Sequence, residues 1–527
     1  MGMRDSPEAG AGFAGKLDKS AMHVALLALA LTVLLRTAWM CDDAEITLRC
    51  VMNFLHGYGP TFNADERVQA FTHPLWFLLI SAATPIFGNI FAATFTLSIA
   101  LSLGAWWLLL SKMTTSFWSG MLAGAALLLS KAYVDYSTSG LESPISHFLL
   151  ICGFLIGFRY LETLERRRAT LSLTLLSSIY LCRPDLVLIV APFCLLILIH
   201  AHQDFRASAR LVATAATPAL LWTIFSVFYY GAPFPNTAYA KLGTGIPPGE
   251  LIHQGFVYLF DSLSRDPLTL TFIAIGLMLA LRQVAALRAI GAGIVIYLVY
   301  VVSIGGDFMS GRFLTVPLLA AAVIVSRTQL AGFAIATLVT VVAALGTVSL
   351  NSTILSGPTY SDRSIPATGI TDERGFMFFG RGLLNAKRDT PDVVLQPDWS
   401  PRPRSVTVQV LCGWLGTNSL GNPPEVHYID PCALTDPLLA RLPAKYEPGW
   451  RIGHFERQIP AGYEDSIRED KNLLKDPLTK DYWEVIRNAT RGPLFSIERF
   501  KAIARLNLGL LRKPDYDMYR TGDAVHR

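Results

Sequence analysis

The chain has 527 residues, of which 52% are apolar and only 16% are charged, and its formal net charge is +5 at pH 7. A soluble domain usually carries about 25% charged residues, so this composition excludes an ordinary soluble protein. The small positive charge is not concentrated in one patch, which excludes a nucleic-acid-binding protein. We therefore expect most of the chain to lie in a lipid bilayer.

Apolar runs of roughly 20 residues recur from Ala21 to about Leu350, and each is long enough to cross a hydrocarbon layer of ~30 Å. They predict a polytopic, mainly α-helical membrane protein with about 11 spans. The first run, residues 21–40, follows a polar start without a clear cleavage site and is expected to be a retained span. Beyond Leu350, Arg, Asp, Glu and Pro become frequent and no spanning run follows, so residues 351–527 are predicted to form a soluble domain.

The short loops fall into a basic set and a less basic set, and this division predicts the orientation of the chain. Lys and Arg concentrate in cytoplasmic loops, so we place residues 1–20 and the basic loops in the cytoplasm. Residues 41–90 and the C-terminal domain are then extracytoplasmic. The alternation requires residues 71–87 to form a juxtamembrane or re-entrant helix, and the His73-Pro74 pair at its start fits that interpretation. The basic loops contain Lys112, Arg168, Arg210, Arg288 and Arg327.

The stretch "CDDAEITLRC", residues 41–50, places Asp42, Asp43 and Glu45 within one helical turn after the first span. One interpretation is structural, with Asp42 as the N-cap and Glu45 completing a capping box. The other is catalytic, because adjacent carboxylates shift each other's pKa and one of them can then transfer a proton. The apolar spacing that follows predicts an amphipathic helix on the outer membrane surface, ending at "GYGP".

Other polar segments fall on the same predicted side of the membrane. A charge near lipid is costly and usually functional, although each residue has a structural alternative: Arg183 neutralises Asp185, Lys241 reaches to the headgroups, and Asp307 caps the next helix. A cavity with carboxylates and cations beside lipid suits a lipid-phosphate sugar, because cations bind the phosphate while a carboxylate takes the acceptor's proton. The polar side chains are Arg183 and Asp185 in "CRPD", Asn236, Tyr239 and Lys241 in "PNTAYAK", and Asp307 and Arg312 in "GGDFMSGRF".

Several ordered motifs together resemble a known family of enzymes. "DDAEITLRC", "TSGLESPI", "CRPDLV", "PNTAYAKLG", "GGDFMSGRFLTVPL" and "GITDERGF" resemble the bacterial integral-membrane glycosyltransferases of the GT-C class, in particular the AftB-type arabinofuranosyltransferases. The likeness extends to "LTDPLLARLP" and "WRIGHFERQIP". It implies a GT-C transmembrane bundle in residues 21–350 with a catalytic outer loop at 41–90, outer juxtamembrane helices and a C-terminal soluble α/β domain, in a bacterial cytoplasmic membrane.

The resemblance also implies an activity and a set of site residues. The donor would be a polyprenyl phosphate sugar of the decaprenyl-phosphoryl-arabinofuranose type, and the acceptor a cell-envelope glycan or glycoprotein. Asp42 and Asp43 would be catalytic, with Asp42 as the base and Asp43 orienting it or holding a proton. Because cationic side chains stabilise the leaving phosphate, no cofactor is required, although the acidic cluster offers a place for a divalent cation. The candidates for substrate binding are Arg49, His73, Glu142, Arg183, Asp185, Asn236, Tyr239, Lys241, Asp307 and Arg312.

Three alternatives remain open at this point. They are a GT-C transferase of another sugar, a transporter or flippase of the lipid-linked sugar, and a structural protein of cell-wall assembly. A transporter leaves the glycosidic bond intact, and a structural protein tolerates substitution of Asp42 and Asp43.

The C-terminal domain adds two observations. Cys412 and Cys432 each follow a short strand-like run, "SVTVQV" and "EVHYI", so they either form a disulfide in an oxidising compartment or remain buried thiols. Trp399, Trp414 and Trp450 either stack on sugars or belong to the core.

Overall fold

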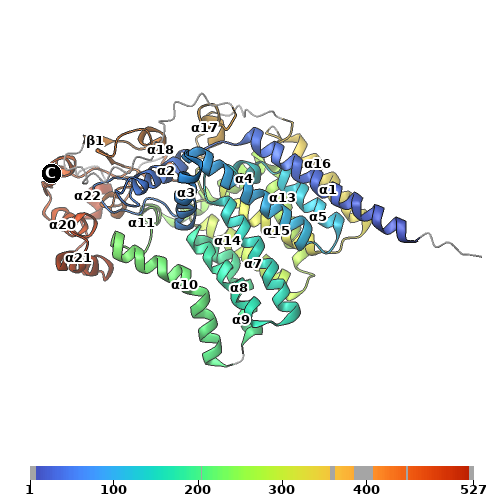
Figure 1. Cartoon of the computed structure of the whole chain (residues 1–527). Coiled ribbons are helices and arrows are strands. Elements are labelled where there is room, and N and C mark those ends of the chain that lie inside the picture. Colours follow the sequence, from blue (N-terminus) through green and yellow to red (C-terminus); the bar gives the residue numbers. More distant parts are fainter. Residues whose placement is uncertain are drawn as a thin grey trace, which may run out of the picture.

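The apolar first part of the chain folds into helices, because a helix satisfies its backbone hydrogen bonds without water. The computed structural model describes residues 8–202, 204–349, 351–355, 363–384, 407–446 and 449–520. Figure 1 shows a bundle of long helices with a smaller C-terminal region at one end. The helices of the first part are α1 (Glu8–Thr37), α2 (Asp42–Leu55), α3 (Pro74–Phe87), α4 (Ile90–Leu108), η1 (Leu109–Met113), α5 (Phe117–Leu129), α6 (Lys131–Tyr136), α7 (Ser143–Thr163), α8 (Arg166–Ser177), η2 (Ser178–Leu181), η3 (Pro184–Leu186), α9 (Val187–Ala201), α10 (Phe205–Tyr230), α11 (Asn236–Leu242), α12 (Pro248–Arg265), α13 (Pro267–Ala280), α14 (Ala285–Ser303), η4 (Arg312–Leu314), α15 (Thr315–Arg327) and α16 (Gly332–Val348).

The chain is a multi-pass membrane protein, but it has fewer full-length spans than the sequence predicted. Among the described residues, 6 helices are long and apolar enough to cross a membrane, or 7 if α12 and α13, which meet at 109°, count as one. The expectation of about 11 spans is therefore not met by full-length helices. Several apolar runs fold into shorter helices: α3, α5 and α16 have 14, 13 and 17 residues, and α15 has 13 and is buried along nearly its whole length. Hydropathy alone does not distinguish such core helices from spans. The full-length candidates are Lys19–Thr37, Ile90–Met113, Ser143–Thr163, Pro184–Ala201, Phe205–Tyr230 and Ala285–Ser303.

Helix α2 spans the acidic stretch and ends before "GYGP", as predicted, but its start and its surroundings differ from the prediction. Its N-cap is Cys41, whose Sγ accepts the N–H of Ala44 at 3.4 Å, so Asp42 is not the cap of its own helix. The helix also does not lie on an open membrane surface. Residues on both of its faces are buried, because it packs against α3 and against α18 of the C-terminal region.

Helix α3 covers the segment that was expected not to cross the membrane. It begins directly after His73, with Pro74 at the first helical position, where the missing N–H has no partner to lose. Its 14 residues make it shorter than the helices of spanning length.

Close packing between α9 and α14 brings two of the polar segments together. A Cβ atom on Gly293 of α14 would lie only 1.9 Å from the carbonyl oxygen of Ile189 on α9, so only glycine permits this approach. Further along α14, the hydroxyl of Tyr297 accepts a hydrogen bond from Arg183 at 2.8 Å and donates one to Asp185 at 3.1 Å. The guanidinium of Arg183 also lies 4.3 Å from the ring centre of Phe313 in η4, so the segment before α9 lies beside the segment that follows α14.

The C-terminal region is a small α/β assembly without a helix of spanning length in its described residues. Strands β1 and β2 pair in parallel, with Thr407 opposite Val426 and Val410 opposite Ile429. Cys412 and Cys432 follow the two strands and form a disulfide, with their Cα atoms 5.3 Å apart, which resolves the alternatives left by the sequence. Its elements are α17 (Glu373–Arg381), β1 (Thr407–Val410), α18 (Leu415–Ser419), β2 (Val426–Ile429), η5 (Leu439–Arg441), α19 (Tyr463–Arg468), α20 (Pro477–Arg491), α21 (Ile497–Asn507) and α22 (Tyr516–Arg520).

This region is held against the helical bundle by side chains that bind backbone carbonyls. Arg499 of α21 donates to the carbonyl oxygens of Phe228 and Tyr229 at the end of α10, at 2.7 and 2.9 Å. In Figure 1, α2 and α11 lie at the same end of the bundle as α20 and α22.

Candidate active site

Two cavities meet at Asp43. The first, which we call the bundle cavity, has a volume of about 750 Å³ and is lined by residues from α2, α11, the loop around His73, the "CRPD" segment and the loop before η4. The second, the C-terminal cavity, has a volume of about 500 Å³ and lies among α17, the Cys412–Leu415 segment and residues 449–456. Asp43 contributes to the lining of both cavities.

Arg312 is the centre of the charged cluster at this junction. Its Nη1 atom lies 3.3 Å from an oxygen of Asp43 and 3.5 Å from one of Asp307, and its Nη2 atom lies 3.7 Å from Glu142. Burial alone would lower the pKa of Arg312, but the carboxylates of Glu142, Asp307 and Asp43 raise it well above its usual value. Arg312 therefore stays cationic and holds three acidic segments together.

Glu142 is the buried anion behind this cluster. It is fully buried, and its carboxylate lies 3.0 Å from Nδ1 of His73 and 3.8 Å from Nε of Arg183. Burial would raise the pKa of Glu142, but the hydrogen bond and charge of His73, together with Arg312 and Arg183, hold it well below its usual range. The other ring nitrogen of His73 lies 2.9 Å from the hydroxyl of Thr47. Glu142 thus orients two arginines and a histidine toward the bundle cavity.

Arg183 and Lys241 bring two further cations to the lining of the bundle cavity. Arg183 pairs with Asp185, so the structural alternative for this pair is present, yet both residues also line the cavity. The guanidinium of Arg183 lies 4.3 Å from the ring centre of Phe313. Tyr239 and Lys241 reach the cavity from α11. Lys241 has no ion-pair partner in the part of the chain that the structure describes.

Asp42 and Asp43 point to different neighbours. The carboxylate of Asp42 accepts the backbone N–H groups of Gly416 at 3.3 Å and Thr417 at 2.8 Å, at the start of α18. Burial raises the pKa of Asp42, and these two hydrogen bonds oppose that shift. Asp42 therefore anchors α18 to α2, whereas Asp43 faces the junction of the cavities.

Glu373 is a site residue that the sequence reasoning did not include. It lies in the first turn of α17, and its Oε1 atom accepts the N–H of Asp42 at 3.1 Å. Burial, followed by the charges of Asp43 and Asp42, raises the pKa of Glu373 well above its usual value. The motif "GITDERGF" pointed to this segment, but no local spacing indicates that Glu373 lies beside a residue more than 300 positions earlier.

The neighbours of Glu373 fix its position. Asp372 pairs with Lys131 of α6 at 3.1 Å, and Nε of Arg374 donates to the carbonyl oxygen of Thr37 at 3.0 Å. These two buried contacts on either side attach the start of α17 to the bundle.

Three of the predicted site residues do not line either cavity: Glu142 lies directly behind the bundle cavity, next to Arg312, and Arg49 and Asn236 bind backbone carbonyls elsewhere. Arg49 is buried and donates to the carbonyl oxygens of Phe62 and Val426, each at 3.0 Å. Asn236 donates to the carbonyl oxygen of Ala433 at 3.0 Å. Each residue connects the bundle to the C-terminal region. The structure brings the other candidates together, at the bundle cavity or directly behind it: His73, Glu142, Arg183, Asp185, Tyr239, Lys241, Asp307 and Arg312, with Asp42 and Asp43.

The fold and the site define a multi-pass helical membrane protein with a charged, partly apolar cavity beside its C-terminal region. The chain is a distant homologue of two terminal β-(1→2)-arabinofuranosyltransferases, as its motifs predicted. It is 28% identical over 328 residues to the protein of Mycobacterium tuberculosis, covering 53% of this chain and 51% of that relative. It is also 28% identical over 338 residues to the protein of Corynebacterium glutamicum, covering 54% and 47%. The matches thus span about half the length of these relatives. No family model and no solved structure matches the chain.

Proposed function

We propose that the chain is a glycosyltransferase that transfers a sugar, D-arabinofuranose, from a polyprenyl phosphate to a glycan or glycoprotein on the outer face of the cytoplasmic membrane. One observation carries this proposal: the Asp43 carboxylate lies where two cavities meet, beside Arg312. A group-transfer enzyme needs a reactive group that both substrates reach. The homology to arabinofuranosyltransferases supports the choice of sugar.

The bundle cavity suits a lipid-phosphate donor. Arg183, Arg312 and Lys241 offer three cations for a phosphate, which is the group that leaves with the electron pair of the broken C–O bond. Phe234 and Leu242, which also line this cavity, are exposed by 49% and 67%. An apolar rim of this kind allows a polyprenyl chain to run from the cavity into the bilayer.

Asp43, rather than Asp42, is the residue that we place at the reacting atoms. Asp42 uses both carboxylate oxygens to bind backbone N–H groups, which leaves them less available to a substrate. Two routes are open to Asp43. In a single displacement it takes the proton of the acceptor hydroxyl, and the configuration inverts; in a double displacement it forms a covalent bond to the anomeric carbon, and the configuration is retained.

The proposal includes no metal ion and no cofactor, because the three cations supply positive charge for the phosphate. Cys412, Asp430 and Cys432 lie close enough to share an ion, but the disulfide uses both sulfurs. That disulfide also supports an outer location for the C-terminal region, because such bonds persist in oxidising compartments.

The proposal is tested with purified protein in detergent and a polyprenyl-phosphoryl arabinofuranose donor. We expect the wild type to consume the donor and to extend a glycan acceptor, as followed by mass spectrometry, and Asp43→Asn to abolish transfer. Asp481→Asn, an exposed residue of α20, is the matched control and should retain full activity. In detergent there are no two sides of a membrane, so a transporter would leave the donor chemically unchanged. A donor that remains intact would therefore overturn the proposal in favour of a transporter.

A further inference from the structure

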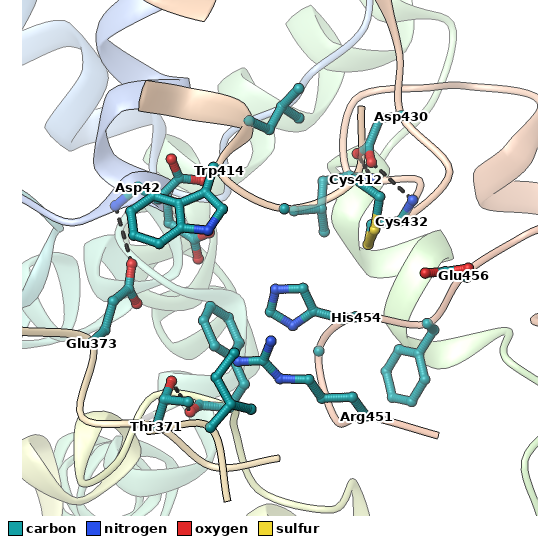
Figure 2. Close-up of a pocket in the computed structure, with 18 of the residues that line it drawn as sticks. Asp42, Thr371, Glu373, Cys412, Trp414, Asp430, Cys432, Arg451, His454 and Glu456 are labelled. Carbon is teal, nitrogen blue, oxygen red and sulfur yellow. Dashed lines mark hydrogen bonds between the residues drawn. A yellow bond between two sulfur atoms is a disulfide. The ribbon is translucent and has the colours of Figure 1, made fainter. Parts of the chain in front are cut away.

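The C-terminal cavity combines an aromatic surface with polar groups. Trp414, Glu373 and His454 lie in its wall (Figure 2). Phe376 and Trp450 also line it. Trp399, a third candidate for stacking, lies outside the described residues.

Trp414 is held in an unusual conformation that leaves its indole in the cavity wall. Its φ angle is 53°, in the left-handed region that bulky residues rarely adopt, and it follows Gly413 at φ 80°. Such conformations persist where the surroundings enforce them and are often found at functional sites. Here the chain is fixed on one side by the disulfide of Cys412 and on the other by the bonds from Gly416 and Thr417 to Asp42.

Trp414 is much more exposed than a tryptophan of the protein core. Its side chain is 49% exposed, whereas Trp483 in the core of the C-terminal region is only 1% exposed. The ring centres of Trp414 and Phe376 lie 6.2 Å apart, nearly edge to face. Figure 2 shows the indole over the cavity, between Asp42 and His454.

Glu373 brings an unsatisfied polar atom to the same cavity. Glu373 is only 8% exposed, and its Oε2 atom has no hydrogen-bond partner among the described residues. Leaving a buried polar atom without a partner is unfavourable, so a ligand hydroxyl at this position would gain a hydrogen bond that water supplies poorly. Nδ1 of His454, on the other side of the cavity, also has no partner among the described residues.

We propose that the C-terminal cavity binds the saccharide acceptor, with one sugar ring stacked on the indole of Trp414 and one hydroxyl hydrogen-bonded to Glu373. A sugar presents an apolar C–H face and a rim of hydroxyls, which match an aromatic surface and isolated polar groups. An apolar ligand would leave Glu373 and His454 without partners. The inference rests on the proposed function, because only transfer makes this saccharide an acceptor.

The position of the cavity explains how such a ligand would react. Asp43 lies in its wall as well as in the wall of the bundle cavity. A saccharide seated against Trp414 and Glu373 would therefore extend toward the donor. In the single displacement its hydroxyl would give its proton to Asp43 and bond the anomeric carbon as the C–O bond to the phosphate breaks; in the double displacement it would bond the same carbon as the bond to Asp43 breaks, and Asp43 would take the proton.

The first test is binding of an arabinofuranose oligosaccharide without donor, measured by saturation-transfer NMR and calorimetry on the full chain in detergent. We expect Trp414→Ala to weaken binding and to raise the acceptor KM by about tenfold, while the donor KM stays unchanged. Trp414→Phe should restore affinity to within about threefold, because it keeps an aromatic face. Trp118→Ala, a 54% exposed tryptophan of α5 outside both cavities, is the matched control and should change nothing.

The second test uses Glu373. Glu373→Ala should weaken binding of the same oligosaccharide by about tenfold, whereas Glu373→Gln, which still hydrogen-bonds a hydroxyl, should keep it within about threefold. The proposal is overturned if the wild type does not bind the oligosaccharide, or if Trp414→Ala and Glu373→Ala bind it as the wild type does. Donor consumption is measured separately, so a failure of the proposed transfer remains distinguishable from a failure of this cavity assignment.

Discussion

Asp42→Asn should mainly lower the stability of the protein, whereas Asp43→Asn should mainly lower its turnover. In the wild type, the N–H of Thr417 lies 2.8 Å from a carboxylate oxygen of Asp42. In Asp42→Asn the amide oxygen can still accept this N–H, but the amide nitrogen would face the N–H of Gly416. The loss of one charge-assisted hydrogen bond costs about 1–3 kcal/mol. We therefore expect a measurable fall in melting temperature and in the protection of α18, with turnover reduced less than about tenfold.

Asp43→Asn should spare the fold and remove the chemistry. The side chain of Asp43 is 21% exposed, and its ion-pair partner among the described residues is Arg312, which also pairs with Asp307 and Glu142. Loss of a general base or nucleophile typically lowers the rate by about 100-fold to 10,000-fold. The assay is donor consumption by mass spectrometry beside thermal unfolding of the same samples. If Asp42→Asn abolished turnover at an unchanged melting temperature, while Asp43→Asn remained active, Asp42 would be the reacting carboxylate.

Three further predictions concern the C-terminal region and the ion requirement. The disulfide closes a separation of 20 residues, so Cys412→Ser with Cys432→Ser should destabilise this region by about 3 kcal/mol, as measured by denaturant unfolding with and without reductant. Burial lowers the pKa of His454 to about 4, so the unfolded chain binds a proton that the folded chain excludes between about pH 4 and 6.5; stability should fall as the pH is lowered through this window, and less so in His454→Gln, as followed by melting temperature against pH. Turnover should survive an excess of EDTA, and a loss that Mg²⁺ or Mn²⁺ restores would contradict the metal-free proposal.

The sequence predicted the class of the fold better than its count of spans. Composition and hydropathy were sufficient to predict a multi-pass helical protein, and the motifs were sufficient to predict the distant homology. They were not sufficient to distinguish α15, which is buried by its neighbours, from a helix that crosses lipid. Both kinds of helix are apolar on all sides, so the difference lies in what surrounds them rather than in their own residues.

The candidate site shows the same limit at longer range. Burying a charge without a partner is costly, and the structure joins Glu142, Arg183, Asp307 and Arg312 in one cluster, whose role in a site stays a prediction. Arg49 was also a candidate for substrate binding, but its guanidinium donates to backbone carbonyl oxygens. Charge alone does not reveal whether its partner is a substrate or the chain itself.

The acidic doublet illustrates why adjacent residues can differ in role. Successive side chains on an α-helix point about 100° apart, so the carboxylates of Asp42 and Asp43 reach different hydrogen-bond and ion-pair partners, although both line the C-terminal cavity. One of them reaches the start of α18 and the other reaches Arg312. The first contact forms a wall of the C-terminal cavity, because α18 continues the chain from Trp414, and the second places a carboxylate at the cavity junction. Capping and catalysis, which the sequence presented as alternatives for a single carboxylate, are thus compatible: Asp42 caps α18 rather than α2, and Asp43 is left for the chemistry that we propose.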